Sequence, residues 1–124
     1  MTIAERAELA AEKNKSYNCC QAVALALADL TDLSEEQLLY AASGFGAGMG
    51  NMEGSCGAVI GAVLIAGLLG AGRNARRINE AFLRRAGALT CKTLKGRETG
   101  TPLLPCVDCV RTAVLAFGEA MGME

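Results

Sequence analysis

Most of this chain alternates between apolar and polar positions at the three-to-four-residue spacing of an amphipathic helix. The first such stretch covers residues 2–15, where Thr2 and Glu5 have the spacing of a capping box. A second helix is expected over residues 17–30, with Ser16 as its cap. The hydrophobic pattern therefore predicts helices from the beginning of the chain.

The middle of the chain contains the most glycine and the most apolar sequence. The capping box that begins at Ser34 predicts a third helix. Residues 44–54 hold so many glycines that we expect an ordered, close-packed loop instead of a helix. Residues 55–72 carry no charge, and Ser55 is their expected cap. We expect this stretch to form a buried core helix and not a membrane span.

The remaining sequence predicts two more helices. One is expected over residues 74–94, with its arginines on a solvated face. Residues 96–105 have the composition of a turn, and Pro105 suits the first turn of a last helix. The expected fold is all-α: a single domain over residues 1–124, a compact bundle of about five or six helices around a buried Gly/Ala-rich central helix.

Composition supports a helical core and excludes several functions. Apolar residues make up 52% of the 124-residue chain and aromatic residues only 4%, which favours closely packed helices. The net charge of −1 gives no electrostatic footprint for nucleic acid. The chain has no histidine, which excludes every Ser-His or Cys-His nucleophile pair. The beginning of the sequence lacks the layout of a signal peptide, so we expect a cytoplasmic protein with reduced or metal-bound cysteines.

Cysteines are the candidate chemistry, and several are predicted at helix starts. The sequence has six: Cys19, Cys20, Cys56, Cys91, Cys106 and Cys109. Cys19, Cys56 and Cys106 fall in expected first turns, where free N–H groups favour a thiolate. Cys56 is therefore expected to be among the most acidic thiols. Cys91 is expected near the end of its helix, where Lys92 and Lys95 favour a thiolate by charge.

Cys106 and Cys109 form a C-x-x-C sequence. At the start of a helix this spacing suits a reversible disulfide or one edge of a metal site. Cys19 and Cys20 are adjacent, and we do not expect them to pair, because vicinal disulfides are strained. For Cys20, a buried thiol without chemistry is as good an interpretation.

The motifs around these cysteines resemble a known family. Residues 56–61 read C-G-A-V-I-G, residues 17–23 read Y-N-C-C-Q-A-V, and the glycine-rich stretch precedes the first of these motifs. Over about residues 16–117 the chain resembles the redox-active protein family described by four cysteines and a CGAxxG motif. The resemblance implies that the family's cysteines are Cys19, Cys56, Cys91 and Cys106. Cys20 and Cys109 are additions to that pattern.

Two versions of the chemistry remain open. In one, Cys19, Cys56, Cys91 and Cys106 converge at one end of the bundle and bind an iron–sulfur cluster, zinc or another thiophilic metal. In the other, the thiols cycle through disulfides, with Cys106 and Cys109 as the nucleophile and the resolving thiol. The function predicted is thus thiol-based redox chemistry or electron transfer, as an oxidoreductase or a carrier, with an unidentified redox partner protein. The alternative is a metal-handling module without redox turnover, and a homodimer is left open.

Overall fold

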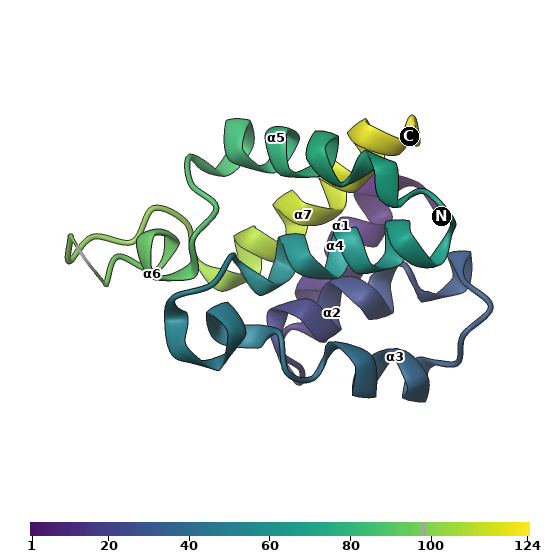
Figure 1. The fold of residues 1–124 in the computed structure, drawn as a ribbon, viewed down its shortest axis with the longest axis horizontal. Helices are drawn as coiled ribbons and strands as arrows, with labels where there is room; N and C mark the ends of the chain where they lie inside the picture. Colours follow the sequence, from purple (N-terminus) through teal and green to yellow (C-terminus); the bar gives the residue numbers. More distant parts are fainter. Residues whose placement is uncertain (98) are drawn as a thin grey trace.

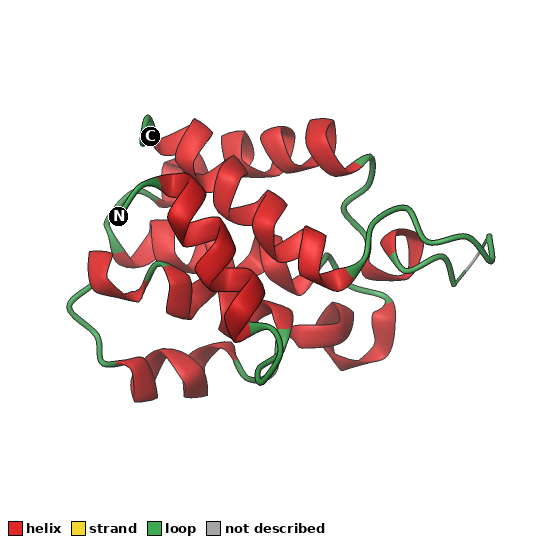
Figure 2. Ribbon diagram, turned by 180° about the vertical axis from the view of Figure 1, so that it is seen from behind, coloured by secondary structure: helices red, strands yellow, loops and turns green. Residues whose placement is uncertain are grey.

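The computed structural model describes residues 1–97 and 99–124, and in these it is built from helices (Figure 1). The α-helices are α1 (Ile3–Lys13), α2 (Cys19–Ala26), α3 (Glu35–Ala42), α4 (Gly57–Leu68), α5 (Ala75–Ala86), α6 (Cys91–Leu94) and α7 (Cys106–Met121). No strand occurs in the described residues, and Figure 2 shows helices joined by loops. The prediction of an all-α fold is confirmed.

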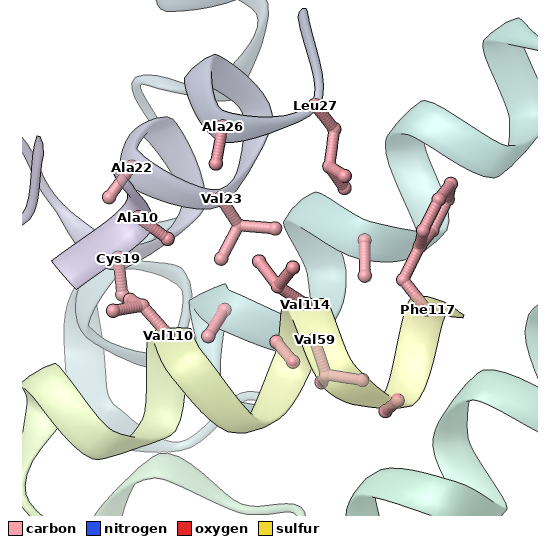
Figure 3. Close-up of a cluster of buried hydrophobic side chains, with 14 of the residues drawn as sticks. Ala10, Cys19, Ala22, Val23, Ala26, Leu27, Val59, Val110, Val114 and Phe117 are labelled. Atoms are coloured by element: carbon pink, nitrogen blue, oxygen red, sulfur yellow. The ribbon is translucent and has the colours of Figure 1, made fainter. Parts of the chain in front are cut away.

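The core forms where α2, α4 and α7 meet. Helix α7 packs against α1, α2, α4 and α5, and α4 packs against α2, α5 and α7. Val23, Val59, Val114 and Phe117 fill the space between these helices (Figure 3). The predicted central helix α4 is buried along one side, while Leu68 at its C-terminal end remains 43% exposed. No described helix is both long and apolar enough to cross a bilayer.

Some of the predicted capping residues begin helices and others do not. The boxes of Thr2 with Glu5 and of Ser34 with Gln37 both form. The second helix, however, begins later than predicted, at Cys19, and its cap is Asn18, not Ser16. Asn18 accepts from the Gln21 backbone N–H, and the Gln21 side chain accepts from that of Asn18. This second box was missed because Ser16 is also a good capping residue.

The helix predicted over residues 74–94 is two helices. Helix α5 ends where Gly87 adopts a left-handed conformation with φ of 90°. This is the common glycine termination of a helix, and it turns the chain back toward the glycine-rich loop. Cys91 therefore begins the short helix α6. The prediction that it lies near the end of a long helix is wrong.

Candidate functional site

The cysteine-bearing helix starts gather at one end of the bundle. Cys19 is the first residue of α2, Cys91 of α6 and Cys106 of α7, while Cys56 is the residue directly before α4. These starts lie at the left-hand end of the molecule in Figure 1. The expectation that Ser55 caps α4 is wrong, because Ser55 forms an isolated β-bridge with Thr90 and Cys56 takes the cap position. That bridge ties the start of α4 to the start of α6.

Four thiols from three helices form an unbroken chain of side-chain interactions, which we call the thiol chain: Cys106, Cys19, Cys56 and Cys109. The Cys19 thiol interacts with Cys106 on one side and with Cys56 on the other, and both interactions shift its pKa. Cys56 in turn interacts with Cys109, which raises the pKa of Cys56. Figure 3 labels Cys19, the first residue of α2, and Val110 of α7 among the buried side chains of the core. Residues separated by up to 90 positions are thus brought into one site.

Glycine makes the close approach of α2 and α4 possible. A Cβ at Gly57 would lie 2.6 Å from the Cys19 sulfur and 2.7 Å from the Phe45 carbonyl oxygen. One turn later, a Cβ at Gly61 would lie 2.8 Å from the Cys20 carbonyl oxygen. Real Cβ atoms do not occupy such positions, so any larger residue would push α4 away from the thiols. Both glycines therefore lie where α4 approaches the cysteine-bearing helix α2 most closely.

The glycine-rich loop closes the site from one side. It is a tightly wound segment in which Ala47, Met49 and Met52 all have positive φ, a conformation that is uncommon outside glycine. The Ala47 backbone hydrogen-bonds to the Cys19 thiol and lowers its pKa, and the Gly54 carbonyl accepts from the Cys91 backbone N–H at 3.0 Å. The loop therefore contacts both the thiol chain and α6.

The model of the family described as "Putative redox-active protein (C_GCAxxG_C_C)" matches residues 17–120. The chain belongs to this family. No curated protein and no solved structure matches the chain. The family description writes the central motif as GCAxxG, whereas this family member has its cysteine and glycine in the order Cys56-Gly57.

Cys91, which the resemblance assigned as the third cysteine of the family pattern, lies beside the thiol chain and not in it. Its sulfur is 3.7 Å from the Met52 sulfur, and it interacts with Cys106 electrostatically. Among residues 1–97 and 99–124, no three side chains of the Cys, Asp or Glu type are arranged to hold a metal ion. The donor set is rich in sulfur, but in the described residues these side chains do not surround a common metal position.

Lys95 is a member of the site whose contact the sequence did not predict. It was expected to act on Cys91, its neighbour one helical turn away. Its ammonium group instead donates to the Cys106 sulfur at 2.8 Å. The charge also acts on Cys91, where it lowers a pKa that burial raises. Lys95 thus places a positive charge at the outer end of the thiol chain.

The helix starts do not make these thiols acidic in this family member. The pKa of Cys56 is raised to about 12, first by its hydrogen bond with Cys109 and then by burial. For Cys19, the hydrogen bond with Cys106 lowers the pKa, but the one with Cys56, together with burial, raises it above its ordinary value. The contact with Cys19 raises the pKa of Cys106, and Lys95 opposes that effect. The expectation of an acidic Cys56 is therefore wrong, because burial among other thiols outweighs the helix terminus.

The two cysteines outside the family pattern have different surroundings. Cys20 is fully buried among apolar side chains and its pKa is raised to about 12, chiefly by burial. Cys109 is fully buried as well, and its sulfur lies 3.6 Å from the Leu104 carbonyl oxygen. Through Cys56 it belongs to the thiol chain, whereas Cys20 has the surroundings of a packing residue.

Proposed function

We propose that this protein performs thiol–disulfide redox chemistry with the thiol chain. The supporting observation is the unbroken series of contacts from Cys106 through Cys19 and Cys56 to Cys109. Each of the six cysteines is a free thiol, which corresponds to the reduced state. Adjacent members can form disulfides, with Cys19–Cys106 and Cys56–Cys109 as the two pairs that use all four thiols.

Each pair exchanges two electrons. Two thiols lose two electrons and two protons when their sulfur–sulfur bond forms, and a disulfide-bearing molecule accepts them and becomes two thiols. The reverse reaction returns the electrons to an oxidised partner. In this function the redox partner is a thiol or disulfide protein, and the four thiols together hold up to four electrons. A cytoplasmic location and a homodimer remain predictions from the sequence.

Burial supports reversible chemistry at these thiols. Cys19, Cys56 and Cys109 are at most 5% exposed. Exposed thiolates are the cysteines most easily oxidised beyond the disulfide to sulfinic and sulfonic acids. Protonated and shielded thiols with a neighbour at hand instead form a disulfide, which a second thiol can reduce. The raised pKa of Cys56 agrees with this protection.

Metal binding is the alternative function, favoured by the position of Cys91 at the same end of the bundle. Cys19, Cys56, Cys91 and Cys106 would supply four sulfur ligands, a set that suits zinc or an iron–sulfur cluster. Such a site would either transfer electrons or handle metal without turnover. In the described residues these side chains do not form a metal-binding arrangement, and the Cys91 sulfur contacts Met52. We therefore derive no reaction step through a metal.

Anaerobic purification followed by metal, sulfide and thiol analysis tests the two functions together. We expect less than one metal ion per chain, six titratable thiols after reduction, and loss of four thiols on equilibration with an oxidising dithiol buffer. Disulfide mapping by mass spectrometry should place the bonds within the thiol chain. Cys20→Ala is the matched control and should leave the redox titration unchanged. Stoichiometric metal with sulfide, or no reversible disulfide within the thiol chain, would contradict the proposal.

A further inference from the structure

We propose that oxidising equivalents reach this protein at Cys106 from a disulfide-bearing partner and pass inward, first to Cys19 and then to the Cys56–Cys109 pair. This inference rests on the proposed function and adds a direction to it. It assigns Cys106 as the attacking thiol, Cys19 as the thiol that resolves the mixed disulfide, and Lys95 as a positioning residue for the Cys106 sulfur.

Cys106 is the most accessible member of the thiol chain. Cys106 is half-buried, whereas each of the other cysteines is buried, and two of them, Cys20 and Cys109, are fully so. Thiol–disulfide exchange needs the attacking sulfur to reach the partner's disulfide in line with the bond that breaks. Of the four members of the thiol chain, Cys106 is the one that meets this need without opening the fold.

The interactions among the four thiols follow one order from Cys106 inward. Cys106 interacts with Cys19, and Cys19 interacts with Cys56, which interacts with Cys109. Cys109 shares the first turn of α7 with Cys106, but its thiol interacts with Cys56 and with the Leu104 carbonyl oxygen. The geometry therefore points to Cys19, from another helix, as the resolving thiol. The sequence had predicted Cys109 for this role.

Lys95 places a positive charge next to the sulfur of Cys106. Its ammonium group lies 2.8 Å from the sulfur of Cys106, the half-buried member of the thiol chain. A positive charge next to a sulfur stabilises the thiolate, which is the nucleophile in exchange reactions. Here it opposes the rise in the pKa of Cys106 that the contact with Cys19 and burial cause. Lys95 reaches Cys106 from the end of α6, so it also orients the sulfur from outside the bundle.

The exchange balances at each step. The Cys106 thiolate, whose proton goes to solvent, attacks the partner disulfide, forms a mixed disulfide and releases one partner thiolate. The Cys19 thiolate then attacks the Cys106 sulfur, forms the Cys19–Cys106 disulfide and releases the second partner thiolate. Attack of Cys56 on Cys19 frees Cys106, and attack of Cys109 on Cys56 frees Cys19. The partner disulfide has then gained two electrons, and the disulfide lies between Cys56 and Cys109.

The test uses the reduced full chain, without oxygen, and 5,5′-dithiobis(2-nitrobenzoate) as the disulfide. Wild type should release two equivalents of thionitrobenzoate per reagent consumed, because the mixed disulfide resolves within the protein. Cys106→Ser should slow the first release at least about tenfold. Cys19→Ser should release one equivalent and keep the other on Cys106, which peptide mass mapping would detect.

Cys91→Ser is the matched control, and Cys109→Ser separates the two candidate resolving thiols, Cys19 and Cys109. Both should still release two equivalents, since neither removes the Cys106–Cys19 pair. Lys95→Gln should slow the first release about tenfold, and Lys95→Arg should restore most of the rate, because the charge is what acts on the sulfur. A merely structural role for Lys95 would change the unfolding midpoint and leave this rate alone.

Mapping of acid-quenched wild-type samples keeps the inference testable if a variant does not fold. Cys19–Cys106 should be the first intramolecular disulfide, followed by Cys56–Cys109. A Cys106–Cys109 disulfide as the first product, or trapping by Cys109→Ser, would overturn the inference while the proposed function stands. If no disulfide forms among the four thiols, both fail.

Discussion

The sulfur of Cys19 occupies the space that a side chain at Gly57 would need. A Cβ there would lie 2.6 Å from that sulfur. The two residues belong to different parts of the family pattern, the first cysteine and the glycine after the second. Their contact explains why these two segments must come together: the missing side chain of Gly57 makes room for the thiol that links Cys106 with Cys56.

Gly57→Ala should therefore disrupt the thiol chain. The added methyl group would press on the Cys19 sulfur and on the Phe45 carbonyl oxygen, 2.7 Å away, and the carbonyl cannot rotate aside. We expect a loss of about 1–3 kcal/mol in the free energy of unfolding, together with faster alkylation of Cys19. Chemical denaturation and mass-resolved alkylation of the folded protein measure the two effects. A fully stable variant with an unreactive Cys19 would contradict this account of Gly57.

Gly61 and Gly67 offer a comparison within one helix. A Cβ at Gly61 meets the Cys20 carbonyl oxygen at 2.8 Å and Val23, whereas a Cβ at Gly67 meets nothing within 4 Å. Gly61→Leu should cost about 3 kcal/mol or more through overpacking. Gly67→Leu should be neutral or stabilise by up to about 1 kcal/mol, because glycine is a poor helix former. Equal effects on the melting temperature would show that the contact between α2 and α4 is not the cause.

Local signals in the sequence predicted that the chain is helical and where some helices begin, but not the break that places Cys91 at a helix start. The capping boxes at Thr2 and Ser34 depend on residues three positions apart, and both form as predicted. Gly87 could have been identified as a helix end, because glycine is the usual residue at that position. The long run of helix-forming residues on both sides concealed it, and with it the place of Cys91 at the start of α6.

The protonation of the thiols depends on distant neighbours that no local pattern reveals. The position of Cys56 at a helix start predicted an acidic thiol. The pKa is instead raised to about 12, first by the hydrogen bond with Cys109, which lies 53 positions along the chain. Likewise, the sequence predicted the effect of Lys95 on nearby Cys91, which is confirmed, but not the contact of its ammonium group with Cys106. Charge and burial at this site become calculable only once α2, α4 and α7 are packed.

The buried thiols should make stability fall in alkaline solution. The pKa of Cys20 rises from an ordinary 9.0 to about 12, mainly through burial. Between these values the unfolded chain loses a proton that the folded chain keeps, so the free energy of unfolding decreases as the pH rises from 9 toward 12. Urea denaturation of reduced protein at several pH values should give a shallower decline for Cys20→Ala. An unchanged slope would contradict the raised pKa of Cys20.

The ion pair between buried Arg6 and Asp29 lies away from the cysteine-bearing helix starts, and removing its carboxylate should destabilise the bundle. Arg6 of α1 is 4% exposed, donates to the Ala26 carbonyl at 3.1 Å and pairs with Asp29 at 2.5 Å. Asp29→Asn leaves the buried guanidinium without its counter-charge, and we expect a loss of about 1–3 kcal/mol in the free energy of unfolding.

Asp29 itself is well exposed, so solvent limits the loss to the lower part of that range. The pair lowers the pKa of Asp29, so its contribution is present at neutral pH and is lost as the pH falls through that lowered value. Asp32→Asn, at a nearby exposed aspartate, is the control and should change stability by less than about 0.5 kcal/mol. Because Asp29 lies on the 3₁₀ turn after α2, away from the cysteine-bearing starts, neither variant should alter the order in which disulfides form. Altered disulfide mapping in Asp29→Asn under conditions where it is folded would show that α1 and the thiol chain are coupled.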